Sequence, residues 1–554
     1  MTEPPSQPKP TQQWGSRLGV ILAVSGSAVG LGNFLRFPGQ AAQNGGGSFM
    51  IPYFLALLFL GIPIGWAEWA MGRYGGRKGF HSAPAILGVI GKGRIARYLG
   101  VVGVLIPLAV YFYYIVIESW CLAYAWDYFA GMAGFAHGVG IDASQPVAEQ
   151  ARVASEHFDN FTGAKFDGVM LDGSIHESVV FWAIVFAINV TLVYRGISKG
   201  IEKFCQIAMP VMAVCALIVL ARVLTLGTPD AAHPEQNVWN GLGQMWNPSF
   251  EALQNPQTWL AAAGQIFFSL SVGFGVIINY ASYMKKRDDV VVSGLTASAT
   301  NELFEVGFGG MITIPAAFVF LGATGTLAAV SAGSFSLGFK TLPVVFAQMP
   351  AGALIGGFWF FMLFLAAITS SLSMLQPTLA FFEEALGWSR QKATTLLVAV
   401  SLAGSAFVLW FSKDLKALSM LDDWVGTLGI FILAMAQIIC FGWVFGIERG
   451  WREMHFGAQL RLWPVWKFVI RYLTPLFLIV VFVAFCWNNL GTWMQAVADD
   501  TTKQLSIGVI LATIGLLVFI TWKGEQRWRK LGLDLDGNEP PPDEVQPKRQ
   551  GGVR

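Results

Sequence analysis

The sequence is short of charge and of the residue groupings that mark enzymes and metal proteins. Asp, Glu, Lys and Arg make up only 13% of the 554 residues, whereas 54% are hydrophobic. Such a composition excludes a disordered chain and a soluble globular domain, and it is typical of a protein with many membrane spans. The six histidines show no metal-like spacing, and no nucleophile stands at a recognisable distance from a base. We therefore expect neither an enzyme nor a nucleic-acid-binding protein.

Cysteine is scarce, and the first residues do not show the pattern of a signal peptide. The five cysteines lie within or beside apolar runs, which favours free packing thiols over disulfides. Residues 1–13 are polar and Pro-rich and lack the basic-then-apolar order of a signal peptide. We expect them to form a cytoplasmic arm. Residues 524–554 are charged and Pro-rich and are expected to form a partly disordered cytoplasmic tail.

Long apolar runs are abundant. About 20 apolar residues cross a bilayer, and twelve runs are long enough: near 15–42, 48–73, 98–128, 177–194, 202–225, 258–284, 291–320, 353–385, 392–411, 418–446, 466–489 and 504–523. The loops after spans 2, 4, 6 and 10 carry clusters of Lys and Arg, but residues 226–257 contain neither. The positive-inside rule then places both termini in the cytoplasm. Twelve spans with this sidedness favour a transporter over a receptor or a membrane enzyme.

Glycine and serine interrupt two of the spans near mid-membrane. The first span is broken between Ser25 and Gly32, and the sixth between Ser269 and Gly275. A helix in lipid must satisfy its own backbone groups, so such breaks predict local unwinding. Freed carbonyls can coordinate a cation, and N–H groups at the start of the next half-helix suit an anion. The alternatives are a Gly-rich packing face and two unrelated flexible helices.

The sequence around the first break carries a family resemblance. GLGNFLRFP, followed by AAxNGGGxFMIPY, closely resembles the first helix of the neurotransmitter:sodium symporters, and the similarity continues from Trp14 to the last apolar span. The resemblance implies an all-α membrane protein of about twelve transmembrane helices. It implies a 5+5 inverted repeat, with helices 1 and 6 unwound at the midplane. The repeats would span residues 14–225 and 258–446, separated by an external loop (226–257) and followed by two further spans (447–523).

The same resemblance implies a function and a location. We expect sodium-coupled symport of neutral, hydrophobic, leucine-like L-amino acids by alternating access. The protein would lie in the inner (plasma) membrane and could form a homodimer. One rival is a sodium-dependent amino-acid sensor that does not transport, although such sensors usually add a soluble signalling domain. The other is an ion channel, which would need a continuous polar path.

Two sodium sites follow from the resemblance. Sodium prefers oxygen ligands, and unwound carbonyls can replace its hydration water. The first site would use the substrate carboxylate with Ala28, Asn33, Ser269 and Asn301. The second site would use Gly26, Val29, Ala366, Thr369 and Ser370. The Thr and Ser hydroxyls of the second site could instead bond back to their own helix.

A zwitterionic substrate would lie between the two breaks. By resemblance, its contacts would be Ala28, Leu31, Gly32, Val110, Tyr114, Phe268, Ser269, Ser271, Phe274, Ser370 and Met374. Amine-carrying relatives have Asp where this chain has Gly30, so the substrate must bring its own carboxylate. The walls are apolar, which disfavours charged side chains. Met374 replaces an Ile of the leucine-carrying pattern, and its adaptable side chain predicts some breadth.

Glu305 lies one helical turn after Asn301. Chloride-dependent relatives have a small polar residue at this position and use chloride to supply a negative charge. A carboxylate built into the chain predicts transport that is independent of chloride. If Glu305 took up a proton after sodium left, the cycle would also export protons.

Residues at the two ends of the pathway resemble gates. Arg36 and Asp422 would pair above the substrate, although Asp423 could compete for the arginine. Tyr113 and Gln265 would assist them. At the inner end Trp14 matches the family, and Glu384 replaces its usual Asp. The partner arginine is missing, because residue 11 is Thr, and we expect Lys9 to be its possible substitute.

Overall fold

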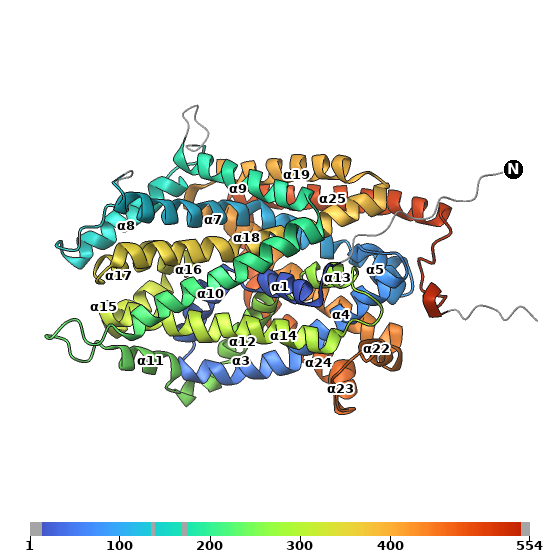
Figure 1. Cartoon of the computed structure of the whole chain (residues 1–554), viewed down its shortest axis with the longest axis horizontal. Helices are drawn as coiled ribbons and strands as arrows, with labels where there is room; N and C mark the ends of the chain where they lie inside the picture. The colour runs from blue at the N-terminus through green and yellow to red at the C-terminus, as the bar shows by residue number, and fades with distance from the viewer. Residues whose placement is uncertain (1–13, 135–138, 169–175, 545–554) are drawn as a thin grey trace, which may run out of the picture.

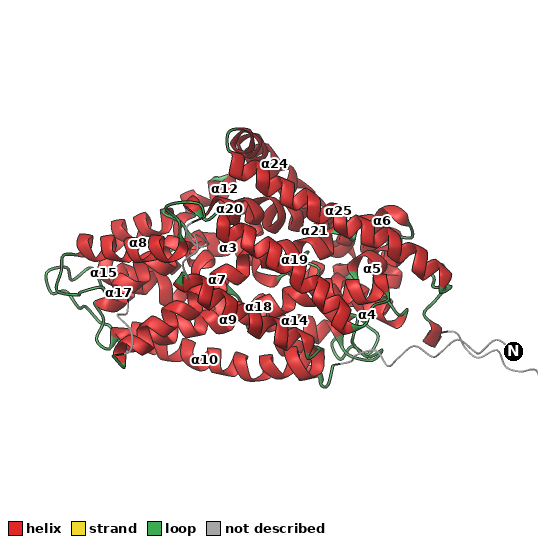
Figure 2. Cartoon of the chain, turned by 90° about the horizontal axis from the view of Figure 1, so that it is seen from above, coloured by secondary structure: helices red, strands yellow, loops and turns green. Residues whose placement is uncertain are grey.

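The computed structural model describes residues 14–134, 139–168 and 176–544. Within these residues the regular secondary structure is helical, apart from one isolated bridge between Gly46 and Pro248, and loops join the helices (Figure 2). The first half of the chain forms these α-helices: α1 (Arg17–Ala28), α2 (Phe37–Gln43), α3 (Met50–Ala56), α4 (Ile62–Arg77), α5 (Ala83–Ile90), α6 (Arg94–Leu99), α7 (Val102–Met132), α8 (Val147–Thr162), α9 (Glu177–Tyr194), α10 (Lys203–Leu224), α11 (Val238–Trp246), α12 (Pro256–Leu270) and α13 (Val276–Ala281). The all-α prediction is confirmed.

The second half continues as an all-helical bundle. Its α-helices are α14 (Val290–Glu302), α15 (Gly310–Ser331), α16 (Ser334–Ser336), α17 (Leu342–Ala347), α18 (Gly352–Leu386), α19 (Arg390–Trp410), α20 (Lys416–Leu421), α21 (Leu428–Ile439), α22 (Ile447–Met454), α23 (Val465–Phe468), α24 (Thr474–Ala498) and α25 (Thr501–Lys530). Short π-helical segments such as Gly32–Arg36 and Ile197–Glu202 join several of them into longer spans. Many of the helices follow the long axis of the molecule (Figure 1).

In the described residues, ten helical stretches are long and apolar enough to cross a membrane. An eleventh is formed by α1 and the helix Gly32–Gln43 together, a pair that is bent by 48° at the break. The predicted sixth span is present as α12 and α13, which have 15 and 6 residues and are each too short to cross alone. The sequence predicts about twelve spans, and eleven pass this test in the described residues. The difference is the sixth span, which is divided at its predicted break.

The core is built around α7 and α18, which pack against each other and are buried along most of their lengths. By contrast, α24 and α25 expose apolar side chains such as Leu476, Val480 and Leu511. Figure 2 shows α24 at the outer edge of the bundle. Apolar side chains on the outer surface suit a protein surrounded by lipid. Lipid tails are as apolar as the protein interior, so these side chains gain little by being buried.

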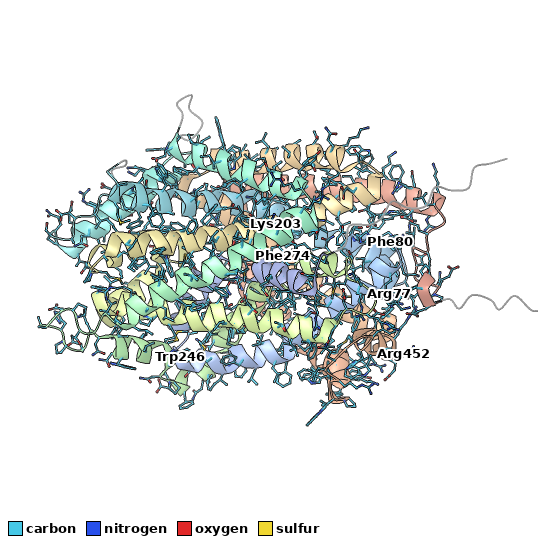
Figure 3. The ribbon with its side chains drawn as sticks, viewed as in Figure 1. Arg77, Phe80, Lys203, Trp246, Phe274 and Arg452 are labelled. Carbon is cyan, nitrogen blue, oxygen red and sulfur yellow. The ribbon has the colours of Figure 1, made fainter. Side chains whose placement is uncertain are left out.

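Basic side chains gather at one end of the bundle. Figure 3 places Arg77 and Arg452 toward the end where α5, α22 and the C-terminal tail lie, opposite α8 and α17. Residues 531–544, which we expected in a partly disordered tail, pack on this end. Asp536 pairs with Arg97 at 2.8 Å, Asp543 pairs with Lys286 at 2.9 Å, and Asp534 pairs with Lys78.

Candidate functional site

The two predicted helix breaks are present and face each other. After α1 ends at Ala28, Val29 is extended, and helix resumes at Gly32. After α12 ends, Ser271 adopts a left-handed conformation with φ of 53°, and α13 starts after Gly275. The hydroxyl of Ser271 donates to the carbonyl of Ser27 at 3.2 Å, which joins the two breaks directly.

Glycine is required at the second break. Gly275 has φ of 86°, which L side chains rarely adopt. A Cβ on it would collide with the backbone of α7 at Gly103. A Cβ on Gly273, where φ is 70°, would lie 2.9 Å from the carbonyl oxygen of Ile430. The unwound segment is therefore seated tightly between α7 and α21.

A cavity of about 440 Å³, part of it open to solvent, lies between the breaks. Ten of the eleven predicted substrate contacts line it, together with Ser27, Gly30 and Asn33. The eleventh, Leu31, lines a second cavity at the outer end of the pathway, which also contains Arg36 and Asp422. Its N–H donates to the hydroxyl of Tyr114 at 3.4 Å. A Cβ on Gly30 would lie 3.0 Å from that hydroxyl oxygen and 3.1 Å from Ser370 Oγ. Without a side chain at position 30, this part of the cavity stays open.

Three of the four residues predicted for the first sodium site form one hydrogen-bonded group, and the fourth, Ala28, lines the cavity. The Asn33 side-chain amide donates to Asn301 Oδ1 at 2.8 Å, and Asn33 Oδ1 accepts from Gly30 N–H at 2.8 Å. The Asn301 amide donates to Ser269 Oγ at 2.5 Å. Asn33, Ser269 and Asn301 are all almost fully buried. The tertiary structure thus brings side chains from α12, α14 and the first break to one point.

The residues predicted for the second site surround the hydroxyl of Ser370. Its Oγ lies 3.1 to 3.4 Å from the carbonyl oxygens of Gly26, Ser27, Val29 and Ala366. Thr369 Oγ1 lies 3.0 and 3.1 Å from the carbonyls of Leu365 and Ala366. A hydroxyl carries one proton, so it satisfies one of these acceptors well and leaves the others without that donor. The arrangement is rich in oxygen ligands.

Glu305 is fully buried beside the first of these groups. Its Oε2 accepts from Asn33 at 3.0 Å and from the Ser269 hydroxyl, and its Oε1 accepts from Gln265 at 2.7 Å. Gln265 therefore donates to Glu305, whereas the sequence led us to expect it beside the outer gate. Nearby, the hydroxyl of Tyr53 donates to Glu302 at 2.8 Å. Sequence reasoning missed Tyr53 and Glu302 because no motif links α3 to α14.

The outer end contains a cavity of about 600 Å³, also partly open, lined by Arg36, Phe268 and Asp422 among others. The Arg36 guanidinium lies over the Phe268 ring, 4.4 Å from its centroid. Asp422 accepts from the Tyr113 hydroxyl at 2.7 Å. Within the described residues Arg36 and Asp422 form no ion pair, so the two predicted gate residues are not paired in this structure.

The inner end departs from the predicted pair. Trp14 is buried, and its indole N–H donates to the carbonyl of Tyr280 at 2.9 Å. Glu384 accepts from the backbone N–H groups of His81 and Ser82 at 2.6 and 2.8 Å. Lys9 and Thr11 lie outside the described residues. The carboxylate of Glu384 is thus bound at the start of α5.

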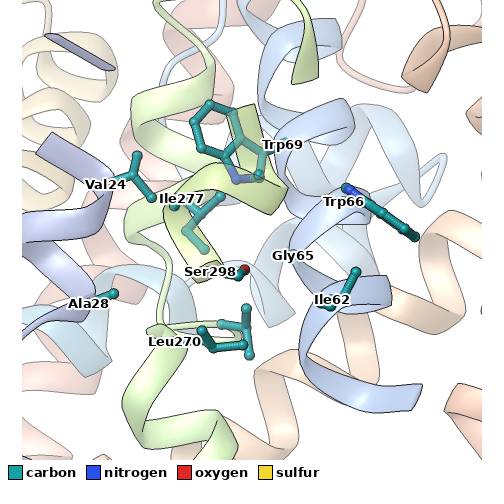
Figure 4. Close-up of a pocket in the computed structure, with 12 residues that line it drawn as sticks. Val24, Ala28, Ile62, Gly65, Trp66, Trp69, Leu270, Ile277 and Ser298 are labelled. Carbon is teal, nitrogen blue, oxygen red and sulfur yellow. The ribbon is translucent and has the colours of Figure 1, made fainter. Parts of the chain in front are cut away.

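A smaller apolar cavity lies behind the first break (Figure 4). Figure 4 shows Val24 and Ala28 of α1 on one side and Ile62, Trp66 and Trp69 of α4 on the other. Its walls carry few polar groups, and they include Ala28 at the first break and Leu270 and Val272 at the second. We regard it as a packing gap.

Comparisons with known proteins identify the chain. The sequence profile of the sodium:neurotransmitter symporter family matches residues 11–522. The chain belongs to this family. It is similar to an uncharacterized sodium-dependent transporter of Methanocaldococcus jannaschii, with 30% identity over 480 residues, 85% of this chain and 89% of the relative. It is also similar to the sodium-dependent neutral amino acid transporter B(0)AT1 of Mus musculus, with 24% identity over 90% of this chain and 85% of the relative.

A solved structure supports the same fold. The crystal structure of MhsT in complex with L-phenylalanine matches with a TM-score of 0.70 and 26% identity, over 85% of this chain and 99% of MhsT. The family assignment and the all-α transporter fold are therefore confirmed. As a symporter of this family the protein is a membrane-spanning, sodium-dependent transporter and not an enzyme. The roles of the individual site residues remain predictions.

Proposed function

We propose that this protein is a symporter that couples sodium to neutral, hydrophobic L-amino acids of the leucine type. Transport would proceed by alternating access, without chloride, across the plasma membrane, with both termini in the cytoplasm. The names of two similar proteins support an amino-acid substrate, since one binds L-phenylalanine and the other is a neutral amino acid transporter. The basic end of the bundle, which would face the cytoplasm, supports the orientation.

The gathering of oxygen atoms around Ser370 Oγ is the observation that carries the sodium part of this proposal. Four carbonyl oxygens converge on this one hydroxyl, although Ser27 also accepts from the Ser271 hydroxyl and Ala366 from that of Thr369. Carbonyl oxygens that converge in this way repel one another, and they suit a small hard cation. The group at Asn33 and Asn301 would hold a second sodium ion next to the substrate.

The cavity between the breaks favours an amino acid over an amine. Tyr114 and the N–H groups that follow the first break lie where a carboxylate would be bound, which suits the start of a half-helix. Carbonyls near Ala28 and the Ser271 hydroxyl would meet the ammonium. Val110, Phe274 and Met374 form an apolar wall. Because a charged side chain would be buried there without a partner, neutral substrates are favoured.

Radiolabelled leucine uptake into proteoliposomes tests the proposal. With an inward sodium gradient we expect accumulation that disappears when potassium or lithium replaces sodium. Asn33→Ala should remove at least nine-tenths of the uptake, because a buried ligand to the first ion would be lost, a change of about 1.4 kcal/mol or more. Asn240→Ala, in the exposed part of α11, is the matched control and should transport normally.

The assay also separates the rival functions. Sodium-dependent leucine binding without accumulation would contradict symport and favour a sensor. Sodium-dependent uptake of another amino acid in place of leucine would keep the symporter and correct the substrate. Uptake that is unchanged in the Asn33 variant would remove the first ion site from the proposal.

A further inference from the structure

The cytoplasmic end of α1 is held by a carboxylate from another helix. Ser16 caps α1, since its Oγ accepts from Gly19 N–H at 2.9 Å. The two preceding backbone donors point elsewhere: Gly15 N–H donates to Glu202 Oε2 at 2.8 Å and Ser16 N–H to Glu202 Oε1 at 3.1 Å. The Ser16 hydroxyl also lies 3.0 Å from Glu202 Oε1. Glu202 thus extends the N-terminal cap of α1 from outside the helix.

The surrounding chain is shaped to let Glu202 reach this position. Glu202 ends the π-helical segment Ile197–Glu202, which leads directly into α10. A Cβ on Gly19 would collide with the Glu202 side chain, so the carboxylate lies directly against the first turn of α1. Only 4% of Glu202 is exposed. A buried carboxylate with several N–H and O–H donors at a helix N-terminus is electrostatically favourable.

Other charged groups at this end of α1 have different partners. Arg17 of α1 lies 3.7 Å from Asp289. Glu384, predicted to hold the N-terminal arm, is engaged by His81 and Ser82. In the described part of the chain, Glu202 is therefore the acid that contacts the start of α1 by hydrogen bonds to its backbone.

We propose that Glu202 is the positioning residue that keeps the cytoplasmic end of α1 closed against α10. Loss of its contacts would let α1 tilt away and open the inner end of the pathway. This inference rests on the proposed alternating-access function. The same movement would disturb the second sodium site. Cys205 lies three residues after Glu202 in α10, and a methyl group on Gly26 would be 3.6 Å from its Sγ. Gly26 supplies one of the carbonyls around Ser370.

Cys205 is a native reporter of this movement, because it is fully buried and faces α1. Its alkylation by N-ethylmaleimide can be followed by mass spectrometry of the full-length protein in proteoliposomes. We expect Glu202→Ala to raise the alkylation rate of Cys205 about five- to tenfold, the effect of losing a helix cap. Glu202→Asp should restore part of the slow rate. Lys203→Ala, at the exposed neighbouring position, should behave as wild type.

Two internal comparisons keep the test sharp. Cys121, fully buried in α7, should stay slow in every variant, whereas general unfolding would raise its rate as well. If Glu202→Ala does not fold, Gly19→Ala displaces the same carboxylate from the α1 side and should give the same increase. Wild-type Cys205 rates in both variants would overturn the proposal. The assay needs no substrate, so an error in the predicted amino acid would leave its result intact.

Discussion

Glu305 is a buried carboxylate whose oxygen atoms already accept hydrogen bonds from Asn33, Ser269 and Gln265. These are the donors that a bound anion would otherwise need at this position. A negative charge fixed to the chain can balance sodium without a second ion, because opposite charges close together in a poorly solvated site attract strongly. The chloride independence that we propose therefore depends on one side chain.

Replacing that side chain should change the ion requirement. We expect wild-type leucine uptake to be equal in chloride and in gluconate. Glu305→Ser should lower uptake in gluconate by at least tenfold and recover in chloride, since the hydroxyl and the three donors would then hold the anion. The measurement is sodium-driven uptake in the two media. If uptake by the Glu305→Ser variant were the same in chloride and in gluconate, Glu305 would not be the group that replaces chloride.

The short loop between α4 and α5 contains a partly buried histidine, His81. The His81 ring stacks on Tyr283 with centroids 4.3 Å apart, and its Nδ1 lies 2.9 Å from the Ser282 hydroxyl. The Nε2 atom is buried with no hydrogen-bond partner among the described residues. Burial lowers the pKa of His81 from 6.5 to about 4. The folded protein therefore holds this histidine neutral.

The sign of the pH effect follows from this shift. Between about pH 6.5 and pH 4 the unfolded chain binds a proton at His81 and the native protein does not, so stability falls as the pH is lowered. The loss from this group is at most about 3 kcal/mol. His81→Phe keeps the stacked ring and should flatten this part of the profile. Thermal unfolding in detergent at pH 7.5 and 5 compares the two; equal pH sensitivity in both proteins would contradict the assignment.

At the scale of the whole molecule, the C-terminal tail ties together elements that are distant in the sequence. Asp536 bonds to Arg97 of α6, and Asp543 bonds to Arg77 at the end of α4 and to Lys286 after α13. Single exposed ion pairs contribute little, but several that share one segment act together. Arg77 and Arg97 are themselves nearly buried. Removing the tail would leave Arg77 with Glu453 and Arg97 with Glu525, and each arginine would lose its further carboxylate partner in the tail.

Truncation after Lys530 should therefore lower the midpoint of thermal unfolding by about 1–3 °C. The difference from the full-length protein should shrink at high salt, because salt screens the exposed partners. Truncation after residue 544, which leaves these pairs intact, is the control. A midpoint that is the same for all three proteins at low salt would show that the tail does not stabilise the bundle.

Among the elements, prediction from sequence succeeded where a long apolar run or a Gly/Ser interruption carried the signal. The broken first span and the split into α12 and α13 both lie where the sequence predicted them. Prediction was less complete for short helices outside the spans, such as α16 and α17. Together they form one apolar helical stretch, Ser334–Ala347, that is shorter than a membrane span, and Ser334 and Phe335 of α16 line the outer cavity.

The sequence alone determined the spans, the two breaks and the residue types around them, because lipid and backbone satisfaction restrict these features locally. Only the tertiary structure decided which groups meet. It directed Gln265 to Glu305, Glu384 to the start of α5 and Glu202 to the start of α1. These contacts join residues 40, 303 and 187 positions apart. Partners so distant are chosen by how the helices pack, which no local pattern of residues records.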